Sequence, residues 1–324
     1  MHILTDCPDE CDHLQGEPAL WKQTDGRHGD WGDLWSAVSD DTSLWTTQTS
    51  RLGTDRSLTY LVVIDRAEAS QFDALLTAVH DKRSLPPGAA VIALEGRSFH
   101  GLRGRVWTAL RGNVHLSVFY PIEINVSDAR GALTMLPAIA VVDAVRALCG
   151  EDVVPGIKWV NDILVEGKKV AGVLTNTQLQ GSKFCNVVFG IGLNVEVGPE
   201  IEPGVFVPAA TCLNAFKGAS RVRMIDILWA LLDALDGRLS TLLSTGYEPI
   251  LDAYREYSIV LGREVRIWKE STDDSPGALM SKFPFAFGTV DAIEADLGLR
   301  IRGRDAVVRS GRLAFEDVCR SFGL

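Results

Sequence analysis

The sequence lacks any long apolar run. No stretch approaches 18 uninterrupted apolar residues, so we expect no membrane-spanning segment. The first residues, MHILTDCPDECDHLQ, are acidic and have neither the basic region and apolar core of a secretory signal nor the arginine-rich character of a transit peptide. We therefore expect a cytoplasmic protein that has no membrane partner.

The sequence also lacks an excess of positive charge, because its formal net charge at pH 7 is −10. A protein that follows nucleic acid needs a basic face. The basic clusters here are local, at residues 97–111 and at Lys168-Lys169, and nothing in residues 1–57 resembles a helix-turn-helix with a basic recognition helix. The charge balance argues against a nucleic-acid partner and makes a DNA-binding regulator the least favoured interpretation.

Closely spaced cysteines are scarce. Of the six cysteines, only Cys7 and Cys11 lie close together, and a C-x3-C pair without a second pair is a weak signal for zinc. We expect reduced thiols and no structural metal site.

The chain of 324 residues is long enough for two domains, and its 46% hydrophobic and 23% charged content is that of an ordinary globular protein. Residues 1–57 hold four tryptophans with little periodicity, which predicts either an extension that lies across the main domain through its indoles or a partly disordered arm. Residues 58–258 alternate predicted strands and helices, among them an apolar helix from Leu133 to Leu148. Residues 259–324 contain short alternating segments (REVRIW, GTVDAI, GLRIRG, AVVRSG) with glycine turns, which predict a small β-barrel. The fold class is therefore α/β.

The stretch from Lys158 to Val173, KWVNDILVEGKKVAGV, is called the central hairpin below. The pattern predicts two strands joined by a turn at Glu166-Gly167. Asn161 and Asp162 follow apolar residues, and polar groups in such places must be hydrogen-bonded, ion-paired or bound to a ligand. Lys169 precedes Gly172, and a fixed cation next to a glycine backbone can hold a carboxylate or a phosphate. An ordinary hairpin with a solvated charged turn explains the same residues equally well.

The segment from Glu95 to Trp107, EGRSFHGLRGRVW, is called the Gly/Arg loop. Glycine lets backbone N–H groups approach a phosphate closely, and arginine supplies charge and a planar fork for its oxygens. This composition favours an anion-binding loop.

Four motifs together resemble one family. The central hairpin resembles the KWPNDxxxxxxKxxGxL signature of biotin–protein ligases, and upstream GLRGRVW and RGNVHLS resemble the family's nucleotide loop and the strand after it. Downstream, FGIGLNV resembles the GIGxNV strand, and residues 210–214 (ATCLN) resemble a segment of the holocarboxylase-synthetase-like branch. The motifs occur in the family's order, and the resemblance covers about residues 58–324.

The resemblance implies a mixed-sheet catalytic domain at 58–258 and an SH3-like C-terminal domain at 259–324, after an N-terminal extension at 1–57. It implies an ATP-dependent, AMP-forming ligase that converts biotin to biotinyl-5′-AMP and transfers biotin to a lysine. That lysine belongs to the biotin carboxyl carrier domain of acetyl-CoA carboxylase or of a related carboxylase. The expected ligands are ATP, Mg²⁺ and biotin, and the family allows a homodimer.

The resemblance also assigns roles to residues. Lys169 is expected to contact both the carboxylate and the α-phosphate, Arg103 and Arg105 the phosphate oxygens, and Asp162 with Asn161 either Mg²⁺ or the attacking carrier lysine. No metal ligand is certain, and Asp162 is the candidate for Mg²⁺. The further residues expected to bind biotin or ATP are Ser70, Arg97, His100, Gly101, Gly104, Trp107, Lys158, Gly172, Gly192 and Asn194.

Some of these assignments have alternatives. Where the family reads GRGR, this chain has Phe99-His100-Gly101-Leu102, so either Arg97 supplies the missing guanidinium or His100 takes its place. Ser70 fits a biotin contact and equally a plain helix N-cap. Trp107 fits an adenine contact or a core residue, and Asn194 fits an adenine contact or the cap of a strand end.

Two alternatives remain for the whole protein. Lipoate ligases and octanoyltransferases share the fold, although the KWVND and FGIGLNV motifs resemble the biotin branch more closely. A non-catalytic carrier-binding protein on the same fold would suit the irregular Gly/Arg loop.

Overall fold

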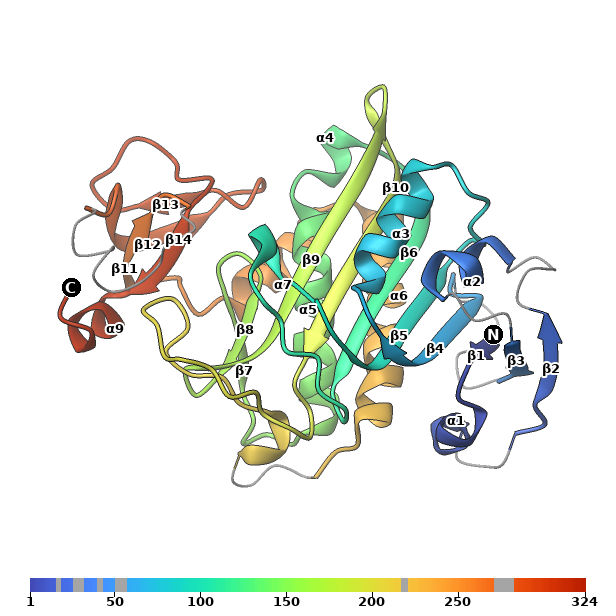
Figure 1. Cartoon of the computed structure of the whole chain (residues 1–324). Coiled ribbons are helices and arrows are strands. Elements are labelled where there is room, and N and C mark those ends of the chain that lie inside the picture. Colours follow the sequence, from blue (N-terminus) through green and yellow to red (C-terminus); the bar gives the residue numbers. More distant parts are fainter. Residues whose placement is uncertain (16–18, 26–31, 40–42, 50–56, 217–220, 271–282) are drawn as a thin grey trace.

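A mixed sheet of ten strands organises the molecule (Figure 1), in the order β2-β3-β1-β4-β5-β6-β10-β9-β8-β7. The computed structural model describes residues 1–15, 19–25, 32–39, 43–49, 57–216, 221–270 and 283–324. The strands are β1 (His2–Thr5), β2 (Lys22–Asp25), β3 (Ser43–Gln48), β4 (Tyr60–Ala67), β5 (Ala89–Gly96), β6 (Val114–Asn125), β7 (Pro155–Lys158), β8 (Asp162–Val165), β9 (Lys168–Gln180) and β10 (Lys183–Leu193).

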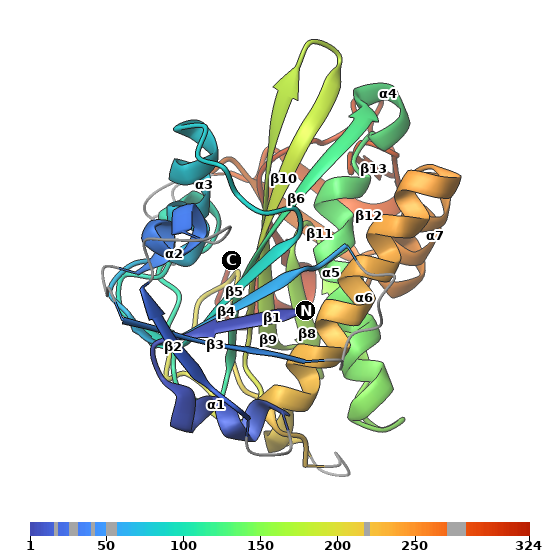
Figure 2. The ribbon, with the colours of Figure 1, turned by 90° about the vertical axis from the view of Figure 1, so that its right-hand side faces the viewer.

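Helices cover both faces of this sheet (Figure 2), which explains why β4 and β5 carry continuous buried apolar runs, at residues 61–64 and 89–94. On one face lie α5 (Ala132–Leu148), α6 (Met224–Thr245) and α7 (Glu248–Tyr257), and on the other lie α2 (Gly32–Val38) and α3 (Gln71–His80). The shorter helices are α1 (Pro8–Gln15) and α4 (Val126–Ala129). The helix that we predicted from Leu133 to Leu148 is confirmed.

Helix α5 is the apolar centre of the fold. The segment Val126–Leu148 is long and apolar enough to cross a membrane by length and composition alone, but 67% of its most apolar window is buried inside the protein. It packs against β9, α6 and α7, so it serves as the core helix under the sheet.

The N-terminal segment extends the central sheet. Strand β1 pairs in parallel with β4 and antiparallel with β3, and β3 pairs with β2. The indole of Trp35 is 1% exposed and packs in a cluster with Leu4, Leu34 and Leu44. The described part of residues 1–57 is therefore joined to the central sheet by strand pairing, which we did not predict. Trp31 lies outside the described residues.

The central hairpin forms as predicted. Strands β8 and β9 are joined by Glu166 and Gly167, which have φ angles of 48° and 77°. Two positive φ angles define the tight turn that suits the twist of a two-residue hairpin. The register shifts once between Ile163 and Leu164, because Ile163 faces Ala171 whereas Leu164 faces Lys169.

A separate antiparallel sheet of four strands follows, in the order β13-β12-β11-β14. It comprises β11 (Glu264–Trp268), β12 (Ala286–Ile293), β13 (Leu299–Ile301) and β14 (Arg312–Phe315), with α9 (Glu316–Ser321) after it, and is called the C-terminal sheet below. It lies at the opposite end of the molecule from β1–β3 (Figure 1). The mixed α/β class with a small C-terminal β unit is thus confirmed.

One predicted strand of this unit is wrong. The residues AVVRSG, at 306–311, contain only a single bridge, between Val308 and Leu299. The strand begins after them, because Gly311 adopts a φ of 131° and redirects the chain into β14.

Candidate functional site

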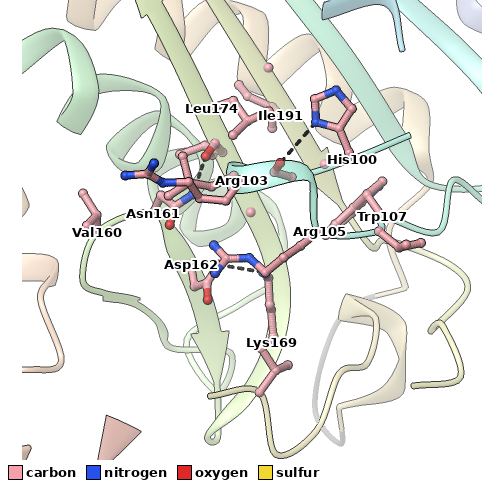
Figure 3. A pocket seen from close by; sticks show the side chains of 18 of the residues that line it. His100, Arg103, Arg105, Trp107, Val160, Asn161, Asp162, Lys169, Leu174 and Ile191 are labelled. Carbon is pink, nitrogen blue, oxygen red and sulfur yellow. Dashed lines mark hydrogen bonds and ion pairs between the residues drawn. The ribbon is translucent and has the colours of Figure 1, made fainter. Parts of the chain in front are cut away.

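A cavity of about 410 Å³ opens between the central sheet and the C-terminal sheet. Its walls come from the Gly/Arg loop, the central hairpin, the end of β10, the segment around Phe206 and residues 309–313 of the C-terminal unit. Elements that lie far apart in the sequence thus meet at one concave site, and Figure 3 shows side chains from several of them.

Lys169 and Asp162 form the ionic centre of this cavity. Lys169 Nζ lies 2.6 Å from Asp162 Oδ1, and each side chain is 21% exposed. Burial alone would raise the pKa of Asp162, but the charges of Lys169 and Lys158 outweigh it and lower the pKa of this carboxyl. Asp162 is therefore ionised, and the Lys169 ammonium is held at the cavity surface beside Gly172.

Lys158 forms the floor of the cavity. It is 4% exposed, and its ammonium donates a hydrogen bond to the carbonyl oxygen of Phe206 at 2.5 Å. Burial lowers the pKa of Lys158 to about 8. In this structure, the hydrogen bond of Lys158 holds the segment around Phe206 against the hairpin.

Asn161 is used by the hairpin itself. Its Nδ2 donates to the carbonyl oxygen of Val173 at 2.7 Å, and its own carbonyl oxygen accepts from the N–H of Val173 at 3.0 Å. This side chain therefore fixes the shape of the approach to Asp162, and it lines the cavity at the same time.

The Gly/Arg loop places its basic residues unequally. Arg105 lines the cavity with its guanidinium 4.0 Å from Glu270, and Arg103 lines it in the left-handed region at a φ of 63°. Arg97 does not line the cavity, because its side chain is 72% exposed and faces Glu68. Gly101 lines the cavity and Gly104 does not.

His100 lies in the cavity wall, which the side chain of Arg97 does not reach. Its Nε2 lies 2.6 Å from Asp73 Oδ2, and its Nδ1 lies 3.2 Å from the carbonyl oxygen of Gly101. Because both ring nitrogens face acceptors, each must carry a proton to make both bonds. The hydrogen bond to Asp73 accordingly raises the pKa of His100. Of the two residues considered for the missing guanidinium, His100 lines the cavity and Arg97 does not; which of them serves a ligand stays a prediction.

The indole of Trp107 packs against the end of β10 at Gly192. A Cβ added to Gly192 would be 2.4 Å from the indole ring, so only glycine allows this approach. The indole Nε1 donates to Nδ1 of His115 at 3.3 Å, and the ammonium of Lys169 is 5.9 Å from the ring centre. Burial lowers the pKa of His115 to about 4, which keeps this imidazole neutral and able to accept that bond.

Asn194 and Ser70 are buried polar residues of the cavity wall. Asn194 is 2% exposed; its Nδ2 donates to the carbonyl oxygen of Thr211 at 3.0 Å, while Oδ1 finds no partner in the part of the chain that the structure describes. Ser70 is 5% exposed and occupies the N-cap position of α3 without a side-chain capping bond. Both residues therefore retain hydrogen-bonding capacity for a ligand.

Several site residues were missed by the sequence reasoning. Asn113 is buried, and its Oδ1 accepts from the N–H groups of Val195, Glu196 and Val197 at 2.8 to 3.2 Å, which fixes the chain after Asn194. Its place in RGNVHLS was the available signal. The other missed residues are His115, Glu270, Arg309 and Arg312.

This fold and cavity define a class of protein, and comparisons with known proteins agree. The model of the biotin/lipoate A/B protein ligase family matches residues 54–194. A biotin–[acetyl-CoA-carboxylase] ligase of Mycobacterium tuberculosis is 31% identical over 229 residues, which is 69% of this chain and 77% of that protein. The chain belongs to the biotin/lipoate A/B protein ligase family.

Particular relatives differ in how much of them is matched. The bifunctional ligase/repressor BirA of Bacillus subtilis is 30% identical over 182 residues, so the match spans 55% of that protein's length. A Paracoccus denitrificans biotin–[acetyl-CoA-carboxylase] ligase is 27% identical over 248 residues, 73% of this chain and 100% of that protein. The solved biotin protein ligase of Aquifex aeolicus in complex with biotin and ATP has a TM-score of 0.57 at 20% identity, covering 79% of this chain and 98% of that chain, and it supports the fold.

Proposed function

We propose that this chain is a biotin–protein ligase, which activates biotin with ATP to biotinyl-5′-AMP and transfers biotin to a carrier lysine. The observation that carries the proposal is the Lys169–Asp162 pair at 2.6 Å in a cavity that also exposes Arg105 and Trp107. Family membership and the names of the relatives from Mycobacterium and Paracoccus support it. We propose the cytoplasm as its location and the biotin carboxyl carrier domain of a carboxylase as its protein substrate.

In the first step, an oxygen of the biotin carboxylate attacks the α-phosphorus of ATP. A C–O–P anhydride bond forms, the bond from the α-phosphorus to the bridging oxygen breaks, and pyrophosphate leaves with the electron pair. Negative charge gathers on the phosphate oxygens, and fixed cations in a water-poor cavity stabilise that charge. Lys169 can contact both reacting groups, and Arg105 can contact the phosphate oxygens.

In the second step, the carrier lysine attacks the carbonyl carbon of the anhydride. The amide bond forms, the bond from the carbonyl carbon to the bridging oxygen breaks, AMP leaves with its electron pair, and the lysine nitrogen releases a proton to solvent. The ionised carboxylate of Asp162 is the group in the cavity suited to orient that amine, because its lowered pKa keeps it an acceptor. Closure of the Gly/Arg loop over the anhydride would exclude water during this step.

The residues present fit a single Mg²⁺ bound largely through ATP. No group of three or more His, Cys, Asp or Glu side chains suited to a metal occurs among the residues with described positions. Mg²⁺ usually needs only one or two protein carboxylates besides phosphate oxygens and water, and Asp162 would be that ligand. When bound, the ion would neutralise phosphate charge.

The apolar inner wall of the cavity also suits an acid substrate other than biotin. The inner wall of the cavity is apolar: the ring of Phe99 fills the space above Gly96, and Phe72, Leu174 and Ile191 line the cavity nearby. An apolar wall accepts the aliphatic chain of lipoate or octanoate as well as the chain of biotin. Lipoate or octanoate activation is therefore the alternative.

The test is ATP–pyrophosphate exchange, measured with biotin, lipoate and octanoate. We expect biotin-dependent exchange that falls at least about 100-fold in Lys169→Ala, the usual cost of removing one group that stabilises transition-state charge. Lys168→Ala is the matched control, because that neighbouring ammonium lies over the ring of Phe216, 5.9 Å from its centre. Absence of exchange with all three acids in the folded wild type would replace the proposal with the carrier-binding interpretation.

A further inference from the structure

Arg111 follows the Gly/Arg loop and faces carboxylates from three elements of the fold. Its Nη2 lies 2.5 Å from Asp65 Oδ1 of β4, and its Nε lies 3.6 Å from Glu95 Oε2 of β5. Its Nη1 lies 3.8 Å from Glu10 Oε2 of α1, which belongs to the N-terminal segment. One exposed ion pair contributes little to stability, but several charges around one guanidinium form a network that holds it in place.

The strand directions explain why these carboxylates meet. Strands β1, β4 and β5 are parallel, so their carboxyl ends lie at the same edge of the sheet. Asp65 and Glu95 lie near the ends of β4 and β5, and Asp6 directly follows β1. Asp6 Oδ1 accepts from the N–H of Asp65 at 2.9 Å, and α1 then brings Glu10 toward Arg111. The N-terminal segment therefore reaches Arg111 because β1 pairs in parallel with β4.

The backbone beside Arg111 leads to the cavity. The carbonyl oxygen of Leu110 accepts from Nε2 of His115 at 3.0 Å. Nδ1 of the same imidazole accepts from the indole Nε1 of Trp107 at 3.3 Å, and both rings line the cavity. A neutral imidazole with its proton on Nε2 has Nδ1 free to accept, so the Leu110 carbonyl selects the tautomer that the indole needs.

Residues 109–112 form the turn that carries this carbonyl group. One backbone hydrogen bond holds each end of the turn, from the N–H of Gly96 at 3.1 Å and from the N–H of Glu196 at 3.2 Å. The guanidinium of Arg111 anchors the middle of the turn to the sheet edge. Loss of that anchor would let the Leu110 carbonyl turn away from the imidazole.

We propose that Arg111 is a positioning residue through which the N-terminal segment fixes the indole of Trp107 for ligand binding. The three carboxylates hold the guanidinium, the guanidinium holds the Leu110 carbonyl, and that carbonyl sets the tautomer of His115. None of the described residues of 1–57 lines the cavity, so the segment acts on the ligand only through this connection. The inference rests on the proposed function in that the ligand beside Trp107 is ATP.

The first test reads the tautomer of His115 from its imidazole ¹⁵N signals and measures ATP affinity by titration, both in the full chain. At pH 7 a pKa of about 4 keeps this ring neutral, and His115→Gln assigns its signals. We expect the Nε2–H form in the wild type. Arg111→Gln should give a mixture of both tautomers and weaken ATP binding about three- to tenfold. Arg111→Lys should lose less, because it keeps the charge without the planar fork.

Arg66→Gln is the matched control for the loss of an arginine at this sheet edge. Arg66 Nε donates to Glu95 Oε1 at 2.7 Å, so it shares a carboxylate with Arg111. Its side chain is 58% exposed and does not line the cavity. We expect the wild-type tautomer of His115 and an ATP affinity within about twofold of the wild type.

A second pair of variants tests the N-terminal segment and leaves Arg111 in place. Glu10→Gln removes the charge of the α1 contact, so we expect the His115 tautomers to shift in the same direction. ATP binding should weaken about two- to threefold, within the range for an exposed ion pair. Asp9→Asn is the control, because Asp9 is an exposed carboxylate in the same first turn of α1. Both substitutions lie at exposed positions, so this comparison decides the matter even if Arg111→Gln does not fold.

The outcomes separate this inference from the proposed function. A folded Arg111→Gln variant with the wild-type tautomer or the wild-type ATP affinity would overturn the inference. Equal tautomer populations and ATP affinities in Glu10→Gln and Asp9→Asn would also overturn it. If ATP affinity and the tautomer depend on Arg111 but no acid supports ATP–pyrophosphate exchange, the positioning role stands and the biotin ligase proposal falls. If biotin-dependent exchange is normal and every variant keeps the wild-type tautomer, the positioning role alone falls.

Discussion

At the scale of single residues, His100 gives the cavity a cation that depends on pH. Its hydrogen bond to Asp73 raises its pKa above the ordinary value of 6.5, so the charged form is present below that raised pKa and is lost as pH rises through it. The Gly/Arg loop is thereby tied to α3 in the lower pH range. An arginine at this position would keep its charge throughout.

We therefore expect the KM for ATP of the wild type to rise as pH passes upward through the raised pKa of His100. His100→Arg should remove that rise, and His100→Gln should give the higher KM at every pH. Steady-state exchange measured from pH 6 to 9 would check this. A His100→Gln variant with the same pH profile as the wild type would exclude the role, since Lys158, whose pKa is about 8, would then explain the profile.

Gly192 determines where the Trp107 indole can lie. Gly192→Ala would place a methyl group 2.4 Å from the ring, so we expect the indole to be displaced and ATP affinity to fall at least about tenfold. Tryptophan fluorescence and nucleotide titration would measure both effects. Gly204→Ala is the control, because a Cβ at Gly204 meets no atom within 4 Å. Unchanged ATP affinity in Gly192→Ala would mean that Trp107 does not contact the nucleotide.

The predicted site residues that the structure brings together in the central hairpin are those whose neighbours in the sequence define them. Asp162 and Lys169 come together because the turn at Glu166 fixes the hairpin register, and a two-residue turn is readable from sequence. Arg312 could not be found in this way, because it reaches the cavity only through the packing of a separate sheet.

At the scale of elements, the three N-terminal strands could not be predicted from the alternation of apolar and polar residues. Strand β2 reads KQTD and β1 has only four residues, so neither shows a sustained alternation. They form because β4 offers a parallel neighbour and α2 covers the added strands with Trp35. Tertiary context of this kind outweighs local propensity. The opposite error occurred at 306–311, where an alternating sequence forms no strand.

Trp35 should therefore account for much of the attachment of this segment. We expect Trp35→Ala to reduce the free energy of unfolding by about 3 to 5 kcal/mol, as for other large buried side chains. Leu20→Ala is the control, because Leu20 is 89% exposed and should change stability by less than about 0.5 kcal/mol. Urea unfolding would compare them. A small effect of Trp35→Ala would show that strand pairing alone retains the segment.

At the scale of the whole molecule, backbone carbonyl groups join the C-terminal unit to the rest. Trp159 Nε1 donates to Leu297 at 2.7 Å, Arg255 donates to Ile293 at 2.6 and 2.9 Å, and the N–H of Gly131 donates to Ala295 at 2.9 Å. Trp159 belongs to the central hairpin and lines the cavity, so one side chain links the cavity to the position of the C-terminal sheet.

Trp159→Phe would leave the carbonyl oxygen of Leu297 without its donor. We expect a loss of about 1 to 3 kcal/mol of stability, the usual cost of a buried unpaired acceptor. Because residues 309–313 of the C-terminal unit line the cavity, ATP affinity should fall as well, whereas biotin affinity should not change. Thermal unfolding and two ligand titrations would separate these effects. Loss of biotin affinity alone would show that Trp159 supports the acid end of the cavity instead.

The two edge strands of the ten-stranded sheet, β2 and β7, influence whether copies of the protein associate with one another. A long, flat, apolar terminal strand invites another chain to add to the sheet. Here one terminal strand, β2, is short and mostly exposed with Lys22 and Asp25 at its ends, and the other, β7, is bridged at Ile157 by the chain around Ser258. Without β2 and β3, the buried residues Ile3 and Leu4 of β1 would stand at the margin. The N-terminal strands thus cover the edge of β1 and disfavour edge-to-edge association of the sheet, independently of the chemistry in the cavity.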